Sequence, residues 1–412
     1  MAEVFSDYFA NIIQLEHRSD TDYTDHPSIK AISNLRFSSE FNYSPVSTSY
    51  IRNILDHLNP RKAVGVDGIS PRILRLGSPL LAEEVTKLIN FCILNRSLPS
   101  EWKQARLTPV FKRGIDTDKA NYRPVSILTS LSTVFEKVIY DQTWNAFHSV
   151  LSSNLSGFMK THSFCTALLK MTEDWRNSID NKEAVAAVAV DLSKAFDAIN
   201  HSLLLAKLKA YGFSPHALEL MSTYLLGRQQ CVRLEGVCSN FKTVKSGVPQ
   251  GSLLGPLLFN IFINDLNFCV PNVSLRLYAD DTTAYLSDVS PTILEFSFNK
   301  DLQTLSSWFE SNHLTVNSTK TQALSVGPCA YHYSLFLNNA RIEFLRSIKI
   351  LGVTLDKDLS YKEHISDQLK KAYAKASALR RIRRFLPHDA MIKLYKALYY
   401  LISNTAVLCS QA

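Results

Sequence analysis

Two adjacent aspartates interrupt a stretch of the chain that otherwise has the composition of a β-strand. Residues 273–287 read VSLRLYADDTTAYLS, with Asp280 and Asp281 at the centre. Because Asp is depleted in strands and neighbouring carboxylates repel each other, the pattern predicts two strands joined by a tight turn at the aspartates. Asp is common in turns, but a charged pair at a hairpin tip also suits a divalent cation, for which carboxylates are good oxygen ligands.

A third carboxylate stands at the end of another predicted strand. The run AVAAVAVDL, residues 184–192, is small, apolar and partly β-branched, which predicts a buried central strand that ends at Asp191. If this strand lies beside the predicted hairpin, Asp191 and Asp280 meet at one edge of the sheet. Two metal ions about 3.5–4 Å apart could then be held between them, an arrangement that promotes in-line phosphoryl displacement.

The remaining patterns predict an α+β fold, with an antiparallel sheet and helices on one side of it. Apolar residues at helical spacing, together with Ser and Ser-Pro starts, predict the helices. These are residues 47–60, 70–76, 78–99, 201–213, 214–228 and 291–312, one helix within 121–147, one opened by Gly251 and Ser252, and one from Tyr361 onward. Alternating runs predict the strands. These are a strand at 102–113, a single strand at 348–356, a hairpin at 229–247, and a hairpin at 333–345 that turns at Asn338 and Asn339.

Composition limits the classes of protein to which the chain can belong. With 412 residues it is too long for one ordinary core, so two or three subdomains are expected. Hydrophobic content of 46% and charged content of 20% indicate a folded, soluble protein. The seven cysteines are scattered without a CxxC pair, which indicates reduced thiols inside the cell. We expect neither a signal peptide nor a membrane-spanning segment.

Basic residues exceed acidic ones, with 45 Lys and Arg against 37 Asp and Glu. Much of the excess lies in residues 361–396, which carry ten Lys and Arg against three Asp and Glu. We expect a helix whose apolar face packs on the core and whose basic face follows a phosphate backbone, although a solvated charged face has the same pattern. The side chains concerned are Lys370, Lys371, Lys375, Arg380, Arg381, Arg383 and Arg384, flanked by Ile365, Leu369, Leu379 and Ile382.

Three stretches follow one another in an order that resembles the active-site motifs of one enzyme family. They are VDLSKAFDAINH at 190–201, SGVPQGSLLGPLLFNIFINDL at 246–266 and LYADDTTAYL at 277–286. They resemble motifs A, B and C of reverse transcriptases, in particular those of non-LTR (LINE-like) retrotransposons. Residues 61–75 and 105–139 resemble the fingers motifs, 314–322 resembles motif D and 348–365 resembles motif E. The resemblance covers about residues 47 to 400.

The resemblance implies a right-hand polymerase with an N-terminal linker, fingers, a palm and a partial, basic, helical thumb. These parts would be residues 1–46, 47–180, 181–360 and 361–412. It also implies that Asp191, Asp280 and Asp281 form the catalytic, metal-binding triad, with two Mg²⁺ ions, or Mn²⁺, as cofactor. Asp281 is expected to be the outer or weaker ligand, because consecutive side chains in an extended chain point apart.

The resemblance assigns further side chains to the incoming nucleotide. Phe196 matches the aromatic residue beneath the sugar, where its ring would collide with a 2′-hydroxyl and so select deoxynucleotides. Gln250 and Gly251 match the segment under the template and the nucleotide, and Lys112 and Arg123 match the fingers residues that contact the triphosphate. Taken alone, a single Phe would be interpreted as core, a single Arg as surface and Pro-Gln-Gly as a turn.

Other residues are implied to contact nucleic acid or to have supporting roles. Arg61 and Lys62 would approach the template strand. The C-terminal cations that would follow the nucleic-acid backbone are Lys370, Lys371, Arg380, Arg381, Arg383 and Arg384. Lys320 matches the motif D lysine and is a candidate to protonate the pyrophosphate leaving group. Asp197 is expected to be structural, as a cap of the helix that follows it.

The implied function is that of an RNA-directed DNA polymerase, a nucleotidyltransferase whose partners are template RNA, a DNA primer or target, and deoxynucleoside triphosphates. By resemblance it works in the nucleus, with the cytoplasm and the oligomeric state left open. Leu155 and Met159 depart from the family pattern, which normally has Gln and Arg there, and the chain leaves little room for a full thumb or an endonuclease. We therefore expect the polymerase core of a larger element, with an inactive nucleic-acid-binding remnant as the alternative. A maturase-like or telomerase-like polymerase would need accessory domains.

Overall fold

The computed structural model describes residues 1–11, 23–35, 40–327 and 331–397. The chain packs into two compact units, each assembled from separate stretches of sequence. The first unit consists of Met1–Ser152, Ser193–Cys269 and Ser307–Thr315, and the second of Ser153–Leu192, Val270–Ser306 and Val316–Ala412. The predicted boundaries of linker, fingers, palm and thumb remain predictions, because compactness alone does not assign those names.

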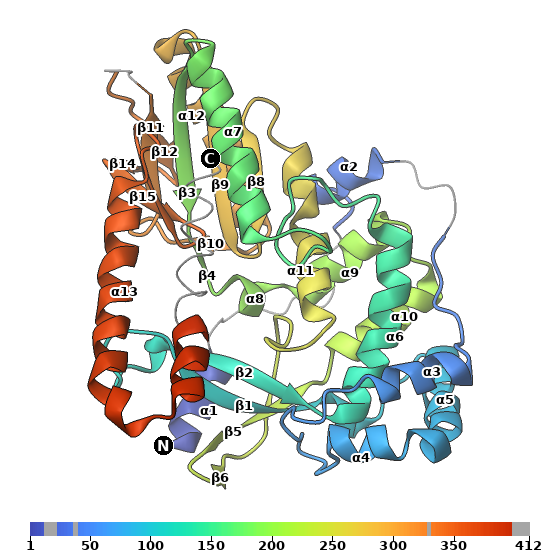
Figure 1. The fold of residues 1–412 in the computed structure, drawn as a ribbon. Coiled ribbons are helices and arrows are strands. Elements are labelled where there is room, and N and C mark those ends of the chain that lie inside the picture. Colours follow the sequence, from blue (N-terminus) through green and yellow to red (C-terminus); the bar gives the residue numbers. More distant parts are fainter. Residues whose placement is uncertain (12–22, 36–39, 328–330, 398–412) are drawn as a thin grey trace. The chain divides into compact units, whose positions relative to one another are not determined.

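The second unit is built on a five-stranded sheet in the order β14-β11-β3-β9-β8 (Figure 1). The strands are β3 (Ala184–Val190), β8 (Ser274–Tyr278), β9 (Asp281–Asp288), β11 (Gln322–Val326) and β14 (Glu343–Phe344). All neighbours are antiparallel except β11 and β14, which run parallel. The central strand β3 is almost entirely buried, as its apolar run predicted. The predicted hairpin around the aspartates is also confirmed, with its turn between β8 and β9.

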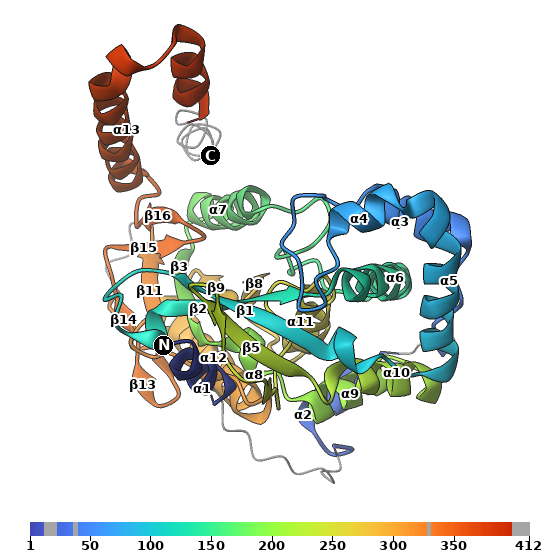
Figure 2. The same cartoon turned by 90° about the horizontal axis from the view of Figure 1, so that it is seen from below.

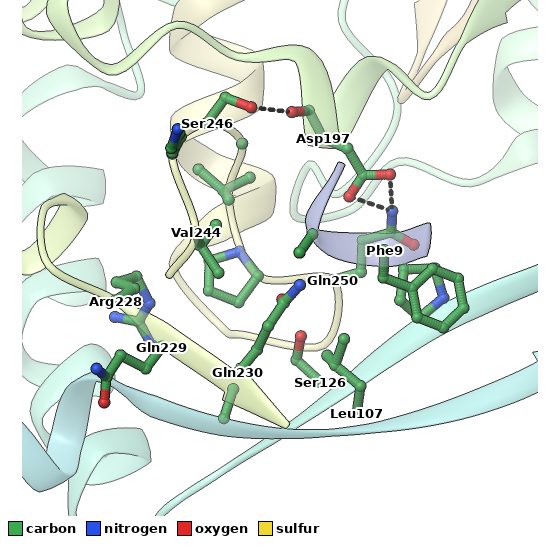
Figure 3. A pocket seen from close by; sticks show the side chains of 17 residues that line it. Phe9, Leu107, Ser126, Asp197, Arg228, Gln229, Gln230, Val244, Ser246 and Gln250 are labelled. Carbon is green, nitrogen blue, oxygen red and sulfur yellow. Dashed lines mark hydrogen bonds between the residues drawn. The ribbon is translucent and has the colours of Figure 1, made fainter. Parts of the chain in front are cut away.

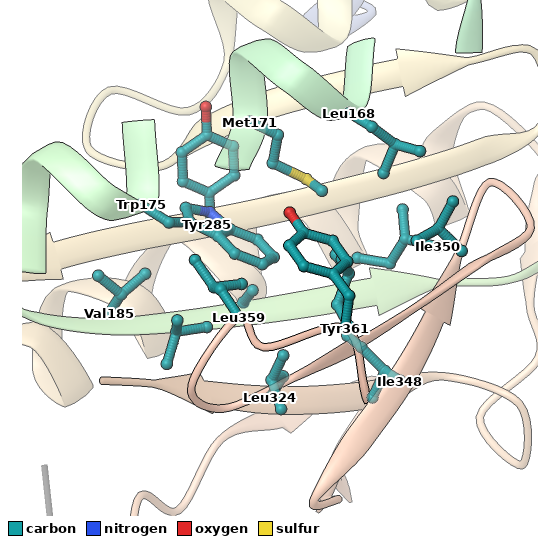
Figure 4. Close-up of a cluster of buried hydrophobic side chains, with 14 residues drawn as sticks. Leu168, Met171, Trp175, Val185, Tyr285, Leu324, Ile348, Ile350, Leu359 and Tyr361 are labelled. Carbon is teal, nitrogen blue, oxygen red and sulfur yellow. The ribbon is translucent and has the colours of Figure 1, made fainter. Parts of the chain in front are cut away.

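Helices cover both faces of this sheet, and not one side as predicted. Helix α7 (Phe164–Asp180) lies along one face, and α12 (Pro291–Ser311) lies on the other (Figures 1 and 2). Trp175 of α7 packs with Val185 and Tyr285 of the sheet in a buried apolar cluster (Figure 4). A strand whose two faces are both apolar requires cover on both sides, which explains the second helical layer.

Two expectations for the C-terminal part of the second unit are wrong. The predicted single strand at 348–356 is a hairpin of β15 (Ser347–Ile350) and β16 (Val353–Asp356), which turns at Leu351 and Gly352. Both turn residues have positive φ, 48° for Leu351 and 88° for Gly352. Leucine is not a residue that sequence patterns associate with such turns, so the turn was not predicted. Helix α13 (Lys362–Ile382) forms where predicted, but among its described residues only His364 is buried, so the expected packing of its apolar face is absent.

The turn predicted at Asn338 and Asn339 is confirmed, since both residues have positive φ between the short strands that they join. Asparagine tolerates this conformation better than most residues, which is why the sequence signal was reliable. The remaining short strands are β4 (Leu192–Ser193), β10 (Thr315–Val316), β12 (Phe336–Leu337) and β13 (Ala340–Arg341).

The first unit combines a second sheet with a group of helices (Figure 2). The strands are β1 (Gln104–Phe111), β2 (Tyr122–Leu128), β5 (Gln229–Leu234), β6 (Val237–Cys238) and β7 (Lys242–Thr243). β1 pairs antiparallel with β2 and parallel with β5, and β5 pairs antiparallel with both β6 and β7. The predicted hairpin within 229–247 is therefore confirmed, with β5 paired to two short strands.

Most helices of the first unit lie where the sequence patterns predicted them, but the helix at 195–198 was not predicted, and two helices form within residues 1–46, which were expected to be a linker. The helices are α1 (Ala2–Ala10), α2 (Pro27–Ser33), α3 (Thr48–Asp56), α4 (Pro71–Leu76), α5 (Ser78–Asn95), α6 (Ser130–Phe147), α8 (Ala195–Ala198), α9 (His201–Ala210), α10 (Pro215–Leu225) and α11 (Gly255–Ile263). The start of α11 differs from the prediction, since the helix begins at Gly255 and not at Gly251 or Ser252. Gly251 has a φ of +119° and cannot belong to a helix, and the Ser252 hydroxyl accepts a hydrogen bond from the Gly255 N–H.

Candidate active site

The structure brings Asp191 and the aspartate hairpin to the same end of the second unit's sheet. Val190, the last residue of β3, pairs with Thr282 of β9, and Tyr278 of β8 pairs with Asp281. Asp191 is the next residue beyond this ladder and Asp281 precedes Thr282, where paired Cα atoms are typically about 4.5–5.5 Å apart. Asp280 lies in the turn itself. Their use as metal ligands remains a prediction.

A cation from the protein already lies against one of these carboxylates. The Lys320 ammonium is 3.6 Å from a carboxylate oxygen of Asp191, and the Asn317 N–H donates to the Asp191 carbonyl. Asp280 and Asp281 are exposed. In the part of the chain that the structure describes, no three His, Cys, Asp or Glu side chains are arranged as a ready metal site. The structure therefore shows neighbouring backbone positions for the three aspartates. It also shows that the Asp191 carboxylate forms an ion pair with Lys320.

The segment that departs from the family pattern supports the aspartate turn. The Leu277 N–H donates to the Asn154 carbonyl at 2.9 Å, and the Ser156 N–H donates to the Leu277 carbonyl at 2.8 Å. Leu155 is buried beside this strand. A Cβ atom added at Gly157 would lie 2.2 Å from the Ala279 nitrogen, next to Asp280. Sequence reasoning missed this role, and only the glycine itself signalled a close backbone approach.

Gly157→Ala is expected to destabilise the protein by about 1–3 kcal/mol, because either the turn or the glycine segment must move to admit the methyl group. Thermal or denaturant unfolding measures the loss. Gly236→Ala is the control, since its added methyl group meets nothing within 4 Å and only its positive φ is strained. An equal loss of stability in both variants would contradict the proposed close contact.

In the first unit, Gln250 and Asp197 border a small cavity of about 60 Å³ (Figure 3). The Gln250 side-chain nitrogen donates to both carboxylate oxygens of Asp197, at 2.8 and 2.9 Å. The Gln250 carbonyl accepts the Ser126 N–H at 2.7 Å. The expected capping role of Asp197 is wrong, because Asn200 caps α9 by accepting the Leu203 N–H. Asp197 instead orients the amide of Gln250.

Burial raises the pKa of Asp197 to about 6, while the hydrogen bond from Gln250 and the charges of Lys194 and Lys112 act in the opposite direction. The ionised carboxylate is thus less stable in the folded chain than in the unfolded chain. The free energy of unfolding should therefore fall as the pH rises from about 4 to about 6.

Asp197→Asn is expected to remove this pH dependence and to stabilise the protein on the order of 1–2 kcal/mol at pH 8. The variant keeps one oxygen to accept from Gln250. Urea unfolding of both proteins at pH 4 and pH 8 measures the effect, and the difference should shrink toward pH 4. A variant that is less stable than the original chain at pH 8 would refute this account of Asp197.

Phe196 is held in one orientation within the first unit. Its half-buried ring stacks on Phe259 of α11, with 4.4 Å between ring centroids and 17° between planes. Its carbonyl accepts the Val248 N–H at 3.0 Å, which ties it to the segment before Gln250. The ring that was predicted to select the sugar therefore has little freedom to swing aside.

A larger cavity of about 570 Å³ is lined by Lys62, which was predicted to approach the template strand, and by Gly251, which was predicted to lie under the template and the nucleotide. Lys137 of α6 and the Ser126 backbone position also line it. A Cβ atom added at Gly251 would lie 2.7 Å from the backbone carbonyl oxygen of Ser126, so glycine is required for this close packing. Ser126 borders the smaller cavity as well, and the Gln250–Gly251 loop therefore has one cavity on each side.

The other predicted contact residues lie outside these two cavities. Val110 of β1 pairs with Arg123 of β2, and Lys112 follows β1. Both cations therefore lie near the loop that joins the two strands. Arg61 is exposed in the loop after α3, next to Lys62. The six predicted C-terminal cations, which are Lys370, Lys371, Arg380, Arg381, Arg383 and Arg384, are exposed on α13 and just after it.

A family model described as reverse transcriptase (RNA-dependent DNA polymerase) matches residues 110–355, and the chain belongs to this family. It is 28% identical over 373 residues to the RNA-directed DNA polymerase from mobile element jockey of Drosophila melanogaster. This similarity extends over 86% of this chain and 40% of that protein. It is 29% identical over 354 residues to the probable RNA-directed DNA polymerase from transposon BS of the same species, covering 82% and 38%.

More distant relatives include the Pol polyprotein of the type-1 retrotransposable element R1 of Bradysia coprophila, which is 26% identical over 365 residues, or 82% of this chain and 34% of that protein. The resemblance to non-LTR reverse transcriptases is confirmed by these matches. The chain spans about two fifths of the length of the jockey protein. Within the residues that the structure describes, no helix is both long and apolar enough to cross a membrane.

Proposed function

We propose that the chain carries the polymerase activity of a non-LTR retrotransposon protein and extends a primer 3′-hydroxyl with deoxynucleotides on an RNA template. The observation that carries this proposal is the position of Asp191 beside the Asp280–Asp281 turn in a chain of the reverse transcriptase family. We also propose a right-hand arrangement, as in the resembled family, with fingers at 47–180, a palm at 181–360 and a partial thumb at 361–412. The working location would be the nucleus.

The carboxylates of the second unit suit divalent metal ions. Their oxygen atoms are the donors that Mg²⁺ prefers, and the ammonium of Lys320 beside Asp191 supports a local preference for cations. Asp191, Asp280 and Asp281 would hold the metal, which when bound lowers the pKa of an attacking hydroxyl and stabilises the leaving oxygen. Lys320, displaced from Asp191, would then be available to protonate the departing pyrophosphate.

The first unit supplies the side chains for the nucleotide and template. Phe196 would exclude a 2′-hydroxyl from the sugar position, and Gln250, oriented by Asp197, would donate to the sugar or base. Lys112 and Arg123 would contact the triphosphate, since a hairpin end with two cations suits its charge. Arg61, Lys62 and the cations of α13 would contact the nucleic-acid backbone.

A second candidate is an inactive nucleic-acid-binding remnant, which is favoured by Met159 in place of the usual arginine and by the absence of a ready metal cluster among the described side chains. Primer extension on poly(rA)/oligo(dT) with dTTP and Mg²⁺ separates the two. Incorporation of dTMP supports the polymerase. Binding of the primed RNA without incorporation supports the remnant.

A further inference from the structure

Glu136 is a fully buried carboxylate in the middle of α6, and both of its oxygens accept hydrogen bonds. One accepts the Tyr224 hydroxyl at 2.6 Å. The other accepts the backbone N–H of Leu253 at 2.8 Å. Buried carboxylates are rare because they lose their hydration, so a carboxylate that is kept in the core commonly has a specific task there.

The backbone group that Glu136 binds belongs to the loop between the two cavities. Gln250 borders the smaller cavity, and Gly251 and Leu253 border the larger one. The loop is attached at its start by the Ser126 N–H, which donates to Gln250, and by the hydrogen bonds between Gln250 and Asp197. The bond from Leu253 to Glu136 attaches its other end.

The surroundings of Glu136 balance its charge. The Arg228 guanidinium lies 5.1 Å from the centroid of the Tyr224 ring, and its Nη1 donates to the Tyr224 carbonyl at 3.1 Å. Arg228 is buried and also lines the smaller cavity. Burial raises the pKa of Glu136, while Tyr224, Arg228 and the N–H groups of Leu253 and Leu254 oppose that rise. The carboxylate thus connects α6, α10 and the loop through one network.

Another buried pair in the same unit shows what a purely structural role looks like. The Lys207 ammonium donates to Asp265 at 2.6 Å, and the Trp308 indole N–H donates to the other Asp265 oxygen at 2.7 Å. All three side chains are buried, and none of them lines either cavity. This second network therefore offers a control with similar chemistry and no bond to the loop.

From these contacts we infer that Glu136 is a positioning residue, whose buried carboxylate fixes the 249–253 loop and thereby sets Gln250 and Gly251 against the nucleotide and the template. The inference rests on the proposed polymerase function. Glu136 touches no substrate itself. Its effect reaches the reaction through the Leu253 N–H and the backbone that connects Leu253 to Gln250.

The test compares three variants of the full chain in primer extension and in amide hydrogen exchange of the 249–255 segment. Glu136→Leu removes both acceptors, and it should raise the KM for dTTP by about tenfold, the equivalent of one hydrogen bond, with a smaller change in kcat. The same variant should lose protection at Leu253. Glu136→Gln keeps one oxygen for the Leu253 N–H and should retain most of the protection and most of the affinity.

Trp308→Phe is the control for lost stability, because it removes one hydrogen bond from the Asp265 network and leaves the loop untouched. It should lower the melting temperature without changing the KM or the exchange of the loop. If Glu136→Leu does not fold, Glu136→Asp takes its place, since its shorter side chain keeps the charge and withdraws the oxygens.

Three results would overturn the inference: unchanged loop exchange in a folded Glu136→Leu or Glu136→Asp variant, an unchanged KM in that variant, or an equal rise in KM in Trp308→Phe. Absence of extension by the unmodified chain would instead reject the polymerase function. In that case the exchange experiment still shows whether Glu136 fixes the loop, so the two failures are distinguishable.

Discussion

Asp280→Asn is expected to reduce primer extension on the order of 10³-fold or more, since groups that stabilise charge in phosphoryl transfer have effects of this size. Asparagine preserves the size of the side chain and the turn, but it removes the negative charge that would hold the metal. Because Asp280 is exposed, the change should leave the melting temperature nearly unaltered. Steady-state extension and thermal unfolding of the same preparation separate the two effects.

Asp180→Asn is a matched control, because Asp180 is an exposed carboxylate of the same unit at the end of α7. The residue precedes β3, whereas Asp191 follows it, so the two lie at opposite ends of that strand. The control should extend primers at the normal rate. Full activity in Asp280→Asn would remove the aspartate pair from the proposed chemistry and with it the basis of the polymerase mechanism.

Phe196→Val is expected to reduce the preference for deoxynucleotides over ribonucleotides roughly 10- to 100-fold, the range that corresponds to relief of an overpacked contact. The smaller side chain leaves space where the ring would meet a 2′-hydroxyl. The ratio of kcat/KM for dTTP and UTP on the same primed template measures this change. Extension with dTTP should fall far less than the ratio.

Phe259→Leu tests whether the stacked partner matters, because loss of the aromatic stack at 4.4 Å frees the Phe196 ring without deleting it. Selectivity in this variant should fall by less than in Phe196→Val. If Phe196→Val keeps the original selectivity, the residue is ordinary core packing, and the sugar is chosen elsewhere.

Local features of the fold could be predicted from the sequence because they depend on few neighbouring residues. The apolar run of β3 and the adjacent aspartates after β8 predicted a central strand and a hairpin, and both are present. The Asn338–Asn339 turn was predicted for the same reason. The Leu351–Gly352 turn was missed, since the leucine carries no signal for a positive φ that tertiary packing imposes.

The parts of the candidate site that were missed depend on contacts between distant segments. Nothing near Asp197 indicates that it binds Gln250, and nothing near Gly157 indicates that it approaches Ala279. Glu136 did leave one trace, because a charged residue among Val134, Phe135 and other buried residues of α6 is unusual. A buried charged residue of this kind indicates that it has a hydrogen-bonding partner, but the sequence does not indicate which residue the partner is.

The interleaving of the two units has a consequence for biosynthesis on the ribosome. Strand β3 cannot complete its sheet until β9 and then β11 have emerged, and Ser307–Thr315 must be made before the first unit is whole. A nascent chain of this kind holds the apolar strand β3 unpaired until β9 has been made, which exposes the strand to aggregation or to chaperones. Premature stop codons before Thr315 would therefore damage both units at once and leave no intact half to accumulate.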